Sequence, residues 1–258
     1  MAIILENVTT ATLLSWMAEK IEVDEDEYQT WKAGEVEKAK QRDLARSRRM
    51  LEGKGFEPRS YVRGSDFRSY LSCARILYWN VHQPKLRKVY MNKSTFGAIK
   101  KHELIQERLE ELGWQGEFAP TMRLPKYNLD GIGHIDVLSP SQTFFVEIKH
   151  NRPSESDELQ CAWYQYSHPM KPTIVILYRT RLVIIPNHVK FIEKYIPRVC
   201  GVIKHPEVLP PIHPNFPRCR GTCDYAERCG RKRRVVMHQG TPENWIEYFK
   251  KIGAWRET

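Results

Sequence analysis

Residues 135–149 read IDVLSPSQTFFVEIK, and this stretch decides the fold because two strand-like runs flank a turn. Residues 135–138 and 144–148 are rich in β-branched and aromatic side chains, which favour strands. Residues 139–142, Ser-Pro-Ser-Gln, are typical of a turn. The pattern therefore predicts a β-hairpin.

The period-2 alternation of strands then assigns the polar residues of this hairpin to one face. With a loop of residues 139–142, residue 138 pairs with 143 and residue 136 with 145. In that register Asp136, Glu147 and Lys149 share a face. The opposite face carries the apolar Val137, Val146 and Ile148.

Two carboxylates on neighbouring strands suit a hard cation such as Mg²⁺ or Mn²⁺, which binds oxygen ligands and keeps several waters. A metal held by Asp136 and Glu147 would activate a water and stabilise charge on a scissile phosphate. Lys149 would orient that water or neutralise the developing charge. On these residues alone an ordinary surface hairpin, with Asp136 paired to Lys149, is the alternative.

Segments with helical patterns flank the hairpin in the sequence. Residues 97–109 have apolar residues at helical spacing, with His102 near the start. Residues 154–164 open with capping and acidic residues, and Gln160 and Tyr164 are one helical turn apart. Residues 172–178 and 181–186 are further strand-like runs. Alternating strands and helices predict an α/β domain.

The order of these motifs resembles the RecB-family branch of the PD-(D/E)XK nucleases, in which a helical histidine, a strand aspartate, (D/E)-x-K and Q-x-x-x-Y follow one another. The resemblance implies a restriction-endonuclease-like core, a mixed central sheet flanked by helices. It also implies the roles of single residues: His102, Asp136 and Glu147 as metal ligands, the backbone carbonyl of Ile148 as another, Lys149 as the catalytic lysine, and Gln160 and Tyr164 as residues that position the lysine or the DNA. His134 and His150 are alternatives to His102, because both are close to the carboxylates in sequence.

The cysteines suggest a second metal centre. Cys219, Cys223 and Cys229 lie close together in a Pro/Gly-rich stretch with few core residues, where a metal can organise the chain. Cys73 is the candidate for a fourth ligand. One cysteine before the nuclease motifs and three after them resembles the CRISPR-associated Cas-four nucleases, which implies a 4Fe-4S cluster on these four thiolates. A zinc site is the alternative, with His205, His213 or Cys200 as the fourth ligand.

The net charge of +10 and the isoelectric point of about 9.3 suit a polyanionic partner. The run Arg231, Lys232, Arg233 and Arg234 follows the last clustered cysteine closely and is a candidate for DNA contact. No apolar run approaches the roughly 18 residues of a membrane span. Without a hydrophobic leader we expect a cytoplasmic protein, or one in the host cytoplasm if it is encoded by a virus.

We expect four regions: a helical, basic N-terminal extension (1–60), the N-terminal part of an iron-sulfur subdomain (61–95), a RecB-like nuclease core (96–200) and a C-terminal iron-sulfur segment with a tail (201–258). The resemblance implies a DNA exonuclease acting on single strands or duplex ends. It further implies a role in CRISPR adaptation beside an integrase complex, or in recombination and repair. A noncatalytic cysteine-metal DNA-binding scaffold and an RNA-directed hydrolase are the alternatives.

Overall fold

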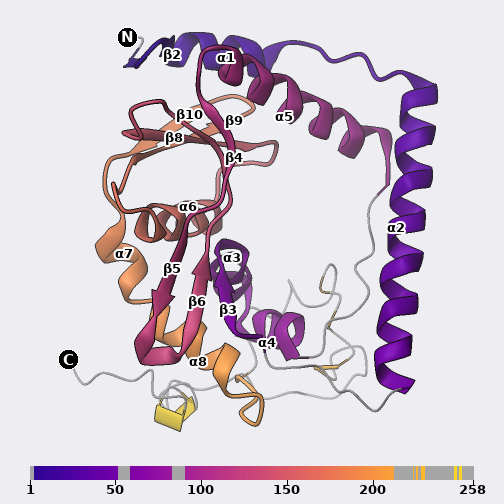
Figure 1. Ribbon diagram of the computed structural model, residues 1–258, viewed down its shortest axis with the longest axis vertical. Helices are drawn as coiled ribbons and strands as arrows, with labels where there is room; N and C mark the ends of the chain where they lie inside the picture. Colours follow the sequence, from indigo (N-terminus) through magenta and orange to yellow (C-terminus); the bar gives the residue numbers. More distant parts are fainter. Residues whose placement is uncertain are drawn as a thin grey trace.

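The computed structural model describes residues 3–51, 59–82 and 91–211, together with residues 223, 225, 228, 229, 247, 248, 250 and 251. The protein has an α/β architecture in which mixed sheets are flanked by helices (Figure 1). The predicted fold class is confirmed at this level. In the described part of the chain no helix is both long and apolar enough to cross a membrane.

The central sheet has five strands in the order β10-β9-β8-β7-β4. They are β4 (Gln115–Phe118), β7 (Ile135–Leu138), β8 (Phe144–Lys149), β9 (Thr173–Tyr178) and β10 (Leu182–Ile185). β8 and β9 are parallel, and the other neighbours are antiparallel. The runs predicted at 172–178 and 181–186 are therefore strands of the same sheet as the hairpin.

The β7–β8 hairpin forms as predicted, but its register differs by two residues. Val137 pairs with Val146 and Leu138 with Phe145. Ser139 continues the ladder, since its N–H donates to the Phe144 carbonyl and its Oγ accepts from the Phe144 N–H. The loop is therefore residues 140–143. A shift of two residues keeps every side chain on its predicted face.

Two hydrophobic clusters cover the two faces of the central sheet. Phe145, Ile174 and Ile176 face one cluster, which includes Phe67 and Trp163. Helices α3 (Gly64–Ser72), α4 (Ala74–His82), α6 (Glu155–Ser167) and α8 (Ile196–Lys204) contribute to that cluster, and α7 (Val189–Glu193) packs beside α6. The other cluster lies under α1 (Thr10–Ala18) and α5 (Lys93–Glu111). Val137, Val146 and Ile148 belong to it.

A smaller sheet of three strands, in the order β3-β6-β5, extends from the body beside α3 and α8 (Figure 1). Its strands are β3 (Tyr61–Arg63), β5 (Thr121–Leu124) and β6 (Leu129–Ile132). A short 3-10 helix, η1 (Pro125–Tyr127), forms the tip between β5 and β6. Asn128 adopts a left-handed conformation there, with φ of 48°, which asparagine tolerates in turns.

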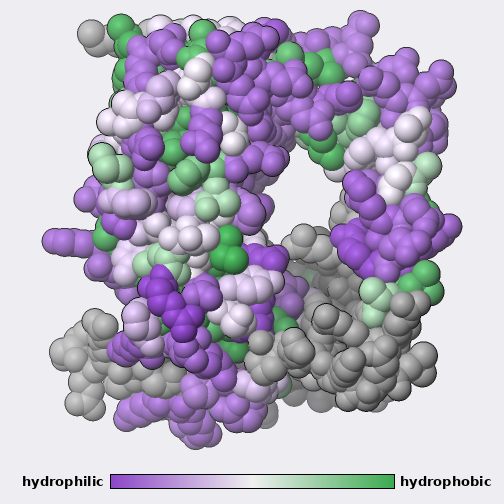
Figure 2. Space-filling view, viewed as in Figure 1, coloured by the Kyte–Doolittle hydropathy of each residue, from purple (hydrophilic) through white to green (hydrophobic). Residues whose placement is uncertain are grey.

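The expected N-terminal extension divides into two parts. The hairpin of β1 (Ile4–Leu5) and β2 (Val8–Thr9) and the following α1 pack into the core, where Leu5, Leu13 and Met17 are buried. Helix α2 (Glu25–Leu51) docks on α5 through its first turns, because Tyr28 and Trp31 pack on Phe96. The rest of α2 stands apart from the sheet (Figure 1), and Figure 2 shows an opening between it and the body, bordered mostly by hydrophilic residues.

Candidate active site

The two predicted acidic residues lie side by side on neighbouring strands. Val137 and Val146 are paired across the two antiparallel strands. Asp136 directly precedes Val137, and Glu147 directly follows Val146, so both carboxylates project from the same face of the sheet. Asp136 Oδ2 accepts a hydrogen bond from the backbone N–H of Ile148, at 2.8 Å. Because the N–H and C=O of one strand residue point to the same edge, the Ile148 carbonyl also faces β7.

Lys149 is bound to Glu147. Its Nζ lies 2.5 Å from Glu147 Oε1, and the two side chains are 14% and 2% exposed. The alternative pairing of Lys149 with Asp136 is thus not the one in the structure. The other carboxylate oxygen, Glu147 Oε2, is buried and accepts no hydrogen bond from the described residues. One acceptor of this site is therefore left for a cation or a water.

Helix α5 brings His102 to the same acidic pair. His102 Nε2 lies 3.6 Å from Asp136 Oδ1, and its side chain is 32% exposed. Burial lowers the pKa of His102, although the charge of Glu147 opposes the shift. Of the two alternatives, His134 is exposed, whereas His150 is half-buried and electrostatically coupled to His102. Sequence alone left these three histidines open, because the packing of α5 against β7 is a tertiary contact.

Helix α6 contributes Gln160 and Tyr164 from beneath the acidic pair. Gln160 Nε2 donates to the Tyr164 hydroxyl at 2.5 Å, while Gln160 Oε1 is buried without a partner among the described residues. Burial raises the pKa of Tyr164 well above its ordinary value, and the charge of Glu147 adds to the shift. Tyr164 is therefore a neutral phenol beside the carboxylates.

A glycine that the sequence did not single out allows this packing. Gly64 begins α3, and a Cβ placed on it would lie 2.4 Å from Tyr164 Cε1 and 3.1 Å from Gln160 Cγ. The first distance would force the Tyr164 ring to shift, and the second would be a tight contact with Gln160. The close contact between α3 and α6 at this point therefore requires glycine at position 64.

The burial of two carboxylates at one place has a large electrostatic cost. Burial raises the pKa of Asp136 to about 6, with the hydrogen bond from Ile148 acting in the opposite direction. Burial and then the charge of Asp136 raise the pKa of Glu147 to about 7. Burial lowers the pKa of Lys149, but the charge of Glu147 outweighs this and raises it overall. Lys149 is therefore a firmly protonated cation at neutral pH.

Glu117 is a third carboxylate that the sequence did not bring forward. It lies on β4 between Gly116 and Phe118, which pair with Val137 and Ile135, so it is level with Asp136. Its negative charge contributes to the raised pKa of Asp136. Glu117 has a left-handed backbone, with φ of 48°, and is exposed. No motif spacing links it to the hairpin, which is why only the sheet order reveals it.

The residues present fit a divalent cation in donor chemistry. Within the described residues, however, no three His, Cys, Asp or Glu side chains form a group that could hold a metal ion as they stand. Lys149 binds one oxygen of Glu147, and the Ile148 amide binds one oxygen of Asp136. Glu147 Oε2 is buried and has no hydrogen-bond partner among the described residues, and both acids have raised pKa values. A bound cation would relieve both.

The four predicted cysteine ligands are partly described. Cys73 is buried and ends α3, directly before α4, whereas Cys219 lies outside the described residues. Cys223 packs against the core cluster that includes Leu77 of α4. No disulfide links Cys73, Cys223 or Cys229 in the structure.

Contacts of Tyr225, Arg228 and Pro210 bring the C-terminal segment back to α4. The Tyr225 hydroxyl donates to Asn80 Oδ1 at 2.7 Å, and the Arg228 guanidinium lies 5.5 Å from the centre of the Trp79 ring. Upstream, Arg75 Nε donates to the Pro210 carbonyl at 2.6 Å. The segment that follows the core therefore docks beside the helix that begins after Cys73. The basic run Arg231, Lys232, Arg233 and Arg234 lies outside the described residues.

Comparisons with known proteins add little to this geometry. No protein-family model matches the chain, and no curated protein does. A solved structure titled "Crystal structure of SSO0001" aligns with 74% of this chain and 96% of its own, at 12% identity and a TM-score of 0.43. A likeness at this level supports no statement about activity, substrate or cofactor.

Proposed function

We propose that this chain is a metal-dependent deoxyribonuclease with a PD-(D/E)XK core, an exonuclease that hydrolyses phosphodiester bonds in single-stranded DNA or at duplex ends. One observation carries the proposal: Asp136 and Glu147 lie side by side on adjacent strands, in a buried site that also contains a protonated lysine. Burying two carboxylates together is costly, and such clusters are concentrated at functional sites.

The candidate metal ligands are Asp136, Glu147, His102 and the carbonyl of Ile148. Mg²⁺ or Mn²⁺ bound there would supply an activated water and charge stabilisation at the phosphate. His102 suits the role of ligand because burial favours its neutral form, which has a free ring nitrogen. The backbone N–H of Ile148 holds Asp136 in a fixed orientation, which preorganises the site.

Lys149 orients the attacking water or neutralises charge on the phosphate. Its raised pKa keeps it cationic at neutral pH, as both roles require. Gln160 and Tyr164 act as positioning residues. Gln160 Oε1 is a buried acceptor with no partner among the described residues, so it can accept a hydrogen bond from Lys149 or from a group of the DNA.

DNA is the proposed substrate because the chain carries a net charge of +10. From the resemblance we propose a role in CRISPR adaptation, beside an integrase complex, or in recombination and repair. The opening between α2 and the body (Figure 2) offers a path for a strand beside the sheet. Arg231, Lys232, Arg233 and Arg234 are proposed to contact the phosphate backbone.

The experiment measures cleavage of single-stranded DNA labelled at the 5′ or the 3′ end, with Mg²⁺, Mn²⁺ or EDTA. Asp136→Asn and Lys149→Ala should lose metal-dependent cleavage. Asp130→Asn is the matched control, since Asp130 is an exposed carboxylate on β6, and it should retain activity. An RNA strand of the same sequence tests the alternative substrate. Activity of Asp136→Asn equal to that of Asp130→Asn would refute the proposal.

We further propose that Cys73, Cys219, Cys223 and Cys229 hold a 4Fe-4S cluster, with zinc as the alternative metal. The docking of Tyr225 and Arg228 on α4 supports this, because these residues lie between Cys223 and Cys229 in the sequence and contact the helix that begins after Cys73. Anaerobically purified protein should be brown and contain iron and sulfide. Cys73→Ser should lose the colour, whereas Cys200→Ser should keep it. A colourless protein that contains zinc would overturn the cluster.

A noncatalytic DNA-binding scaffold is the second candidate function. The ion pair between Lys149 and Glu147 favours it, since that contact neutralises the buried carboxylate without a metal. The same labelled strands separate the two candidates. A scaffold binds the DNA with and without EDTA and leaves it intact in Mg²⁺ and Mn²⁺.

A further inference from the structure

Arg68 of α3 and Asp157 of α6 form an ion pair between the two helices. Arg68 Nε lies 3.7 Å from Asp157 Oδ1, and the side chain of Asp157 is 0% exposed, whereas that of Arg68 is 46% exposed. The contact is too long for a hydrogen bond, and Asp157 Oδ1 accepts none from the described residues. The pair is therefore a buried carboxylate that faces a half-exposed guanidinium.

The other oxygen of Asp157 is held by its neighbours. Asp157 Oδ2 accepts hydrogen bonds from Ser154 Oγ at 2.7 Å and from Asn151 Nδ2 at 3.0 Å. The Tyr178 hydroxyl lies 3.5 Å from the same oxygen. These contacts fix the carboxylate in one orientation, with Oδ1 toward Arg68. Burying this charge is costly, and Arg68 is the cation paired with it.

Helices α3 and α6 carry this pair along the contact that also supports the acidic site. Asp157, Gln160 and Tyr164 are three and four residues apart, so they share one face of α6. Gly64 of α3 lies against Gln160 and Tyr164. Arg68 is one helical turn further along α3 than Gly64, or about 5.4 Å. The ion pair therefore lies about one turn from Gln160.

The sheet places the same pair beside Lys149. Lys149 and Tyr178 are opposite each other at the ends of the parallel strands β8 and β9, so their side chains lie on one face. Tyr178 reaches Asp157 on that face. Arg68 is therefore separated from Lys149 by the side chains of Tyr178 and Asp157. In α/β proteins the carboxyl ends of parallel strands are the edge at which ligands bind.

A DNA strand at the acidic site needs a cation besides Lys149. Asp136 and Glu147 repel a phosphate, and Lys149 is engaged with Glu147 at 2.5 Å. Arg68 contacts Asp157 through Nε, and no hydrogen bond to another described residue uses its two Nη groups. Arginine presents such groups as a planar fork that matches two phosphate oxygens.

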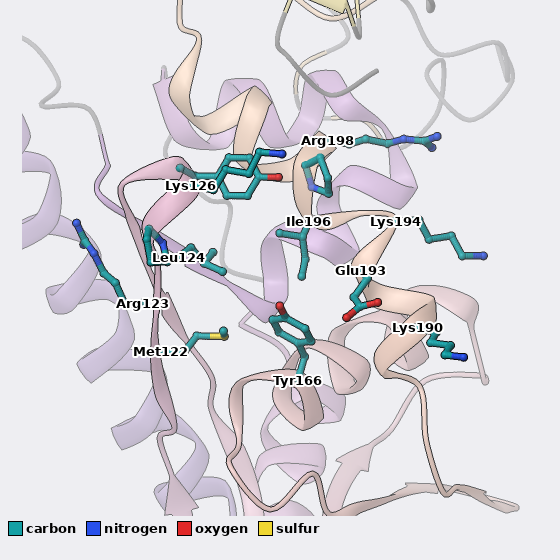
Figure 3. A pocket seen from close by; sticks show the side chains of 13 residues that line it. Met122, Arg123, Leu124, Lys126, Tyr166, Lys190, Glu193, Lys194, Ile196 and Arg198 are labelled. Carbon is teal, nitrogen blue, oxygen red and sulfur yellow. The ribbon is translucent and has the colours of Figure 1, made fainter. Parts of the chain in front are cut away.

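The cations around a cavity elsewhere on α6 are placed differently. This cavity of about 860 Å³ lies between the small sheet and helices α7 and α8, with Tyr166 in its wall (Figure 3). The side chains of Lys190, Lys194 and Arg198 extend away from it (Figure 3). Lys194 Nζ lies over the Phe191 ring, 5.1 Å from its centre, and the residue is exposed. Lys194 is therefore a matched control cation outside the acidic site.

We infer that Arg68 binds a backbone phosphate of the DNA strand that occupies the acidic site, and that Asp157 positions it. The inference rests on the proposed substrate, DNA, and not on its cleavage. The alternative is an ion pair that only joins α3 to α6. That alternative predicts a change in stability without a change in DNA binding.

The test measures binding of a labelled single strand by fluorescence anisotropy, in EDTA and at several salt concentrations. Arg68→Gln should weaken binding about tenfold, as expected for the loss of a hydrogen-bonded charge contact. The slope of log K against log salt should fall by about 0.7, because one phosphate contact is lost. Arg68→Lys keeps the charge and should retain the slope. Lys194→Gln should bind as the wild type does.

Asp157→Asn separates the positioning of Arg68 from the general effect of charge. The substitution removes a negative charge, so general electrostatics predict tighter binding. We expect binding about threefold weaker instead, because Arg68 must then be ordered when the strand binds. Urea denaturation checks that each variant is folded. The double variant Arg68→Gln/Asp157→Asn leaves no buried charge unpaired, and it should bind as Arg68→Gln does.

The outcomes distinguish this inference from the proposed nuclease. Binding by folded Arg68→Gln equal to that of Lys194→Gln would overturn the role of Arg68, even if the wild type cleaves DNA. Tighter binding by Asp157→Asn would overturn the positioning role of Asp157. A wild type that binds the strand through Arg68 but leaves it intact in Mg²⁺ would refute the nuclease and support the inference.

Discussion

Lys149 Nζ lies 2.5 Å from Glu147 Oε1 at the end of β8, and both side chains are almost entirely buried. Each residue compensates a charge that the other could not bury alone. The pair therefore has two functions, one in stability and one in the proposed chemistry. The two functions can be measured separately, because stability is measured in the absence of metal and cleavage in its presence.

Lys149→Met should destabilise the metal-free protein. Removing the cation leaves Glu147 buried without compensation, and we expect the free energy of unfolding near pH 8 to fall by about 3 kcal/mol. Urea denaturation in EDTA measures this. Lys38→Met is the control, because Lys38 pairs with Glu35 on the surface of α2, where ion pairs contribute little. Equal losses in the two variants would contradict a buried pair.

The contribution of Asp136 and Glu147 to the stability of the metal-free protein should decrease as the pH rises from about 5 to about 8. Burial raises the pKa of Asp136 to about 6 and that of Glu147 to about 7, so the folded protein retains protons that the unfolded chain has released. The contribution of these two acids is then greatest below their unfolded pKa values and falls as the pH rises through the folded ones. Urea midpoints over this interval measure the slope.

Glu147→Gln should flatten that pH dependence, because the amide has no proton to lose. Glu111→Gln, at the exposed end of α5, should keep the slope of the wild type. Addition of Mn²⁺ should restore more stability near pH 8 than near pH 5, since cations bind the ionised carboxylates. A Glu147→Gln slope equal to that of the wild type would show that Glu147 does not retain its proton in the folded protein as described.

Gly64→Ala should disturb the support of the site. The added Cβ would lie 2.4 Å from Tyr164 Cε1, and the ring is fixed by its contacts in the core. We expect a loss of about 1–3 kcal/mol in unfolding free energy, together with reduced cleavage. Gly34→Ala is the matched control, since a Cβ on Gly34 of α2 meets nothing within 4 Å. That control should gain about 0.5–1 kcal/mol.

His102→Ala should weaken metal binding while His134→Ala should not. His102 Nε2 lies 3.6 Å from Asp136 Oδ1, whereas His134 is exposed. The Mn²⁺ concentration that gives half-maximal cleavage should rise roughly tenfold or more in His102→Ala. The same rise in His134→Ala alone would assign the role of metal ligand to His134. A rise in His150→Ala alone would assign the role to His150.

The local sequence determined the elements that carry the site and the face on which each residue lies. Alternation places Asp136, Glu147 and Lys149 opposite Val137 and Val146, and this holds in the structure although the register moved by two residues. Helices were predicted at 97–109 and 154–164 because apolar spacing and capping residues are properties of neighbouring positions, and α5 and α6 form there.

Only the tertiary structure decided which of these elements meet. Packing of α5 against β7 brings His102 to Asp136, and the sheet order places Glu117 level with the same residue. The Gly64 contact depends on how closely α3 approaches α6, and the cavity at Tyr166 requires the small sheet to face α7 and α8. Such contacts depend on the shapes of whole surfaces, which no local pattern records. Hence the sequence alone indicated which side chains form the site, whereas packing decided the distances between them and, through burial, their pKa values.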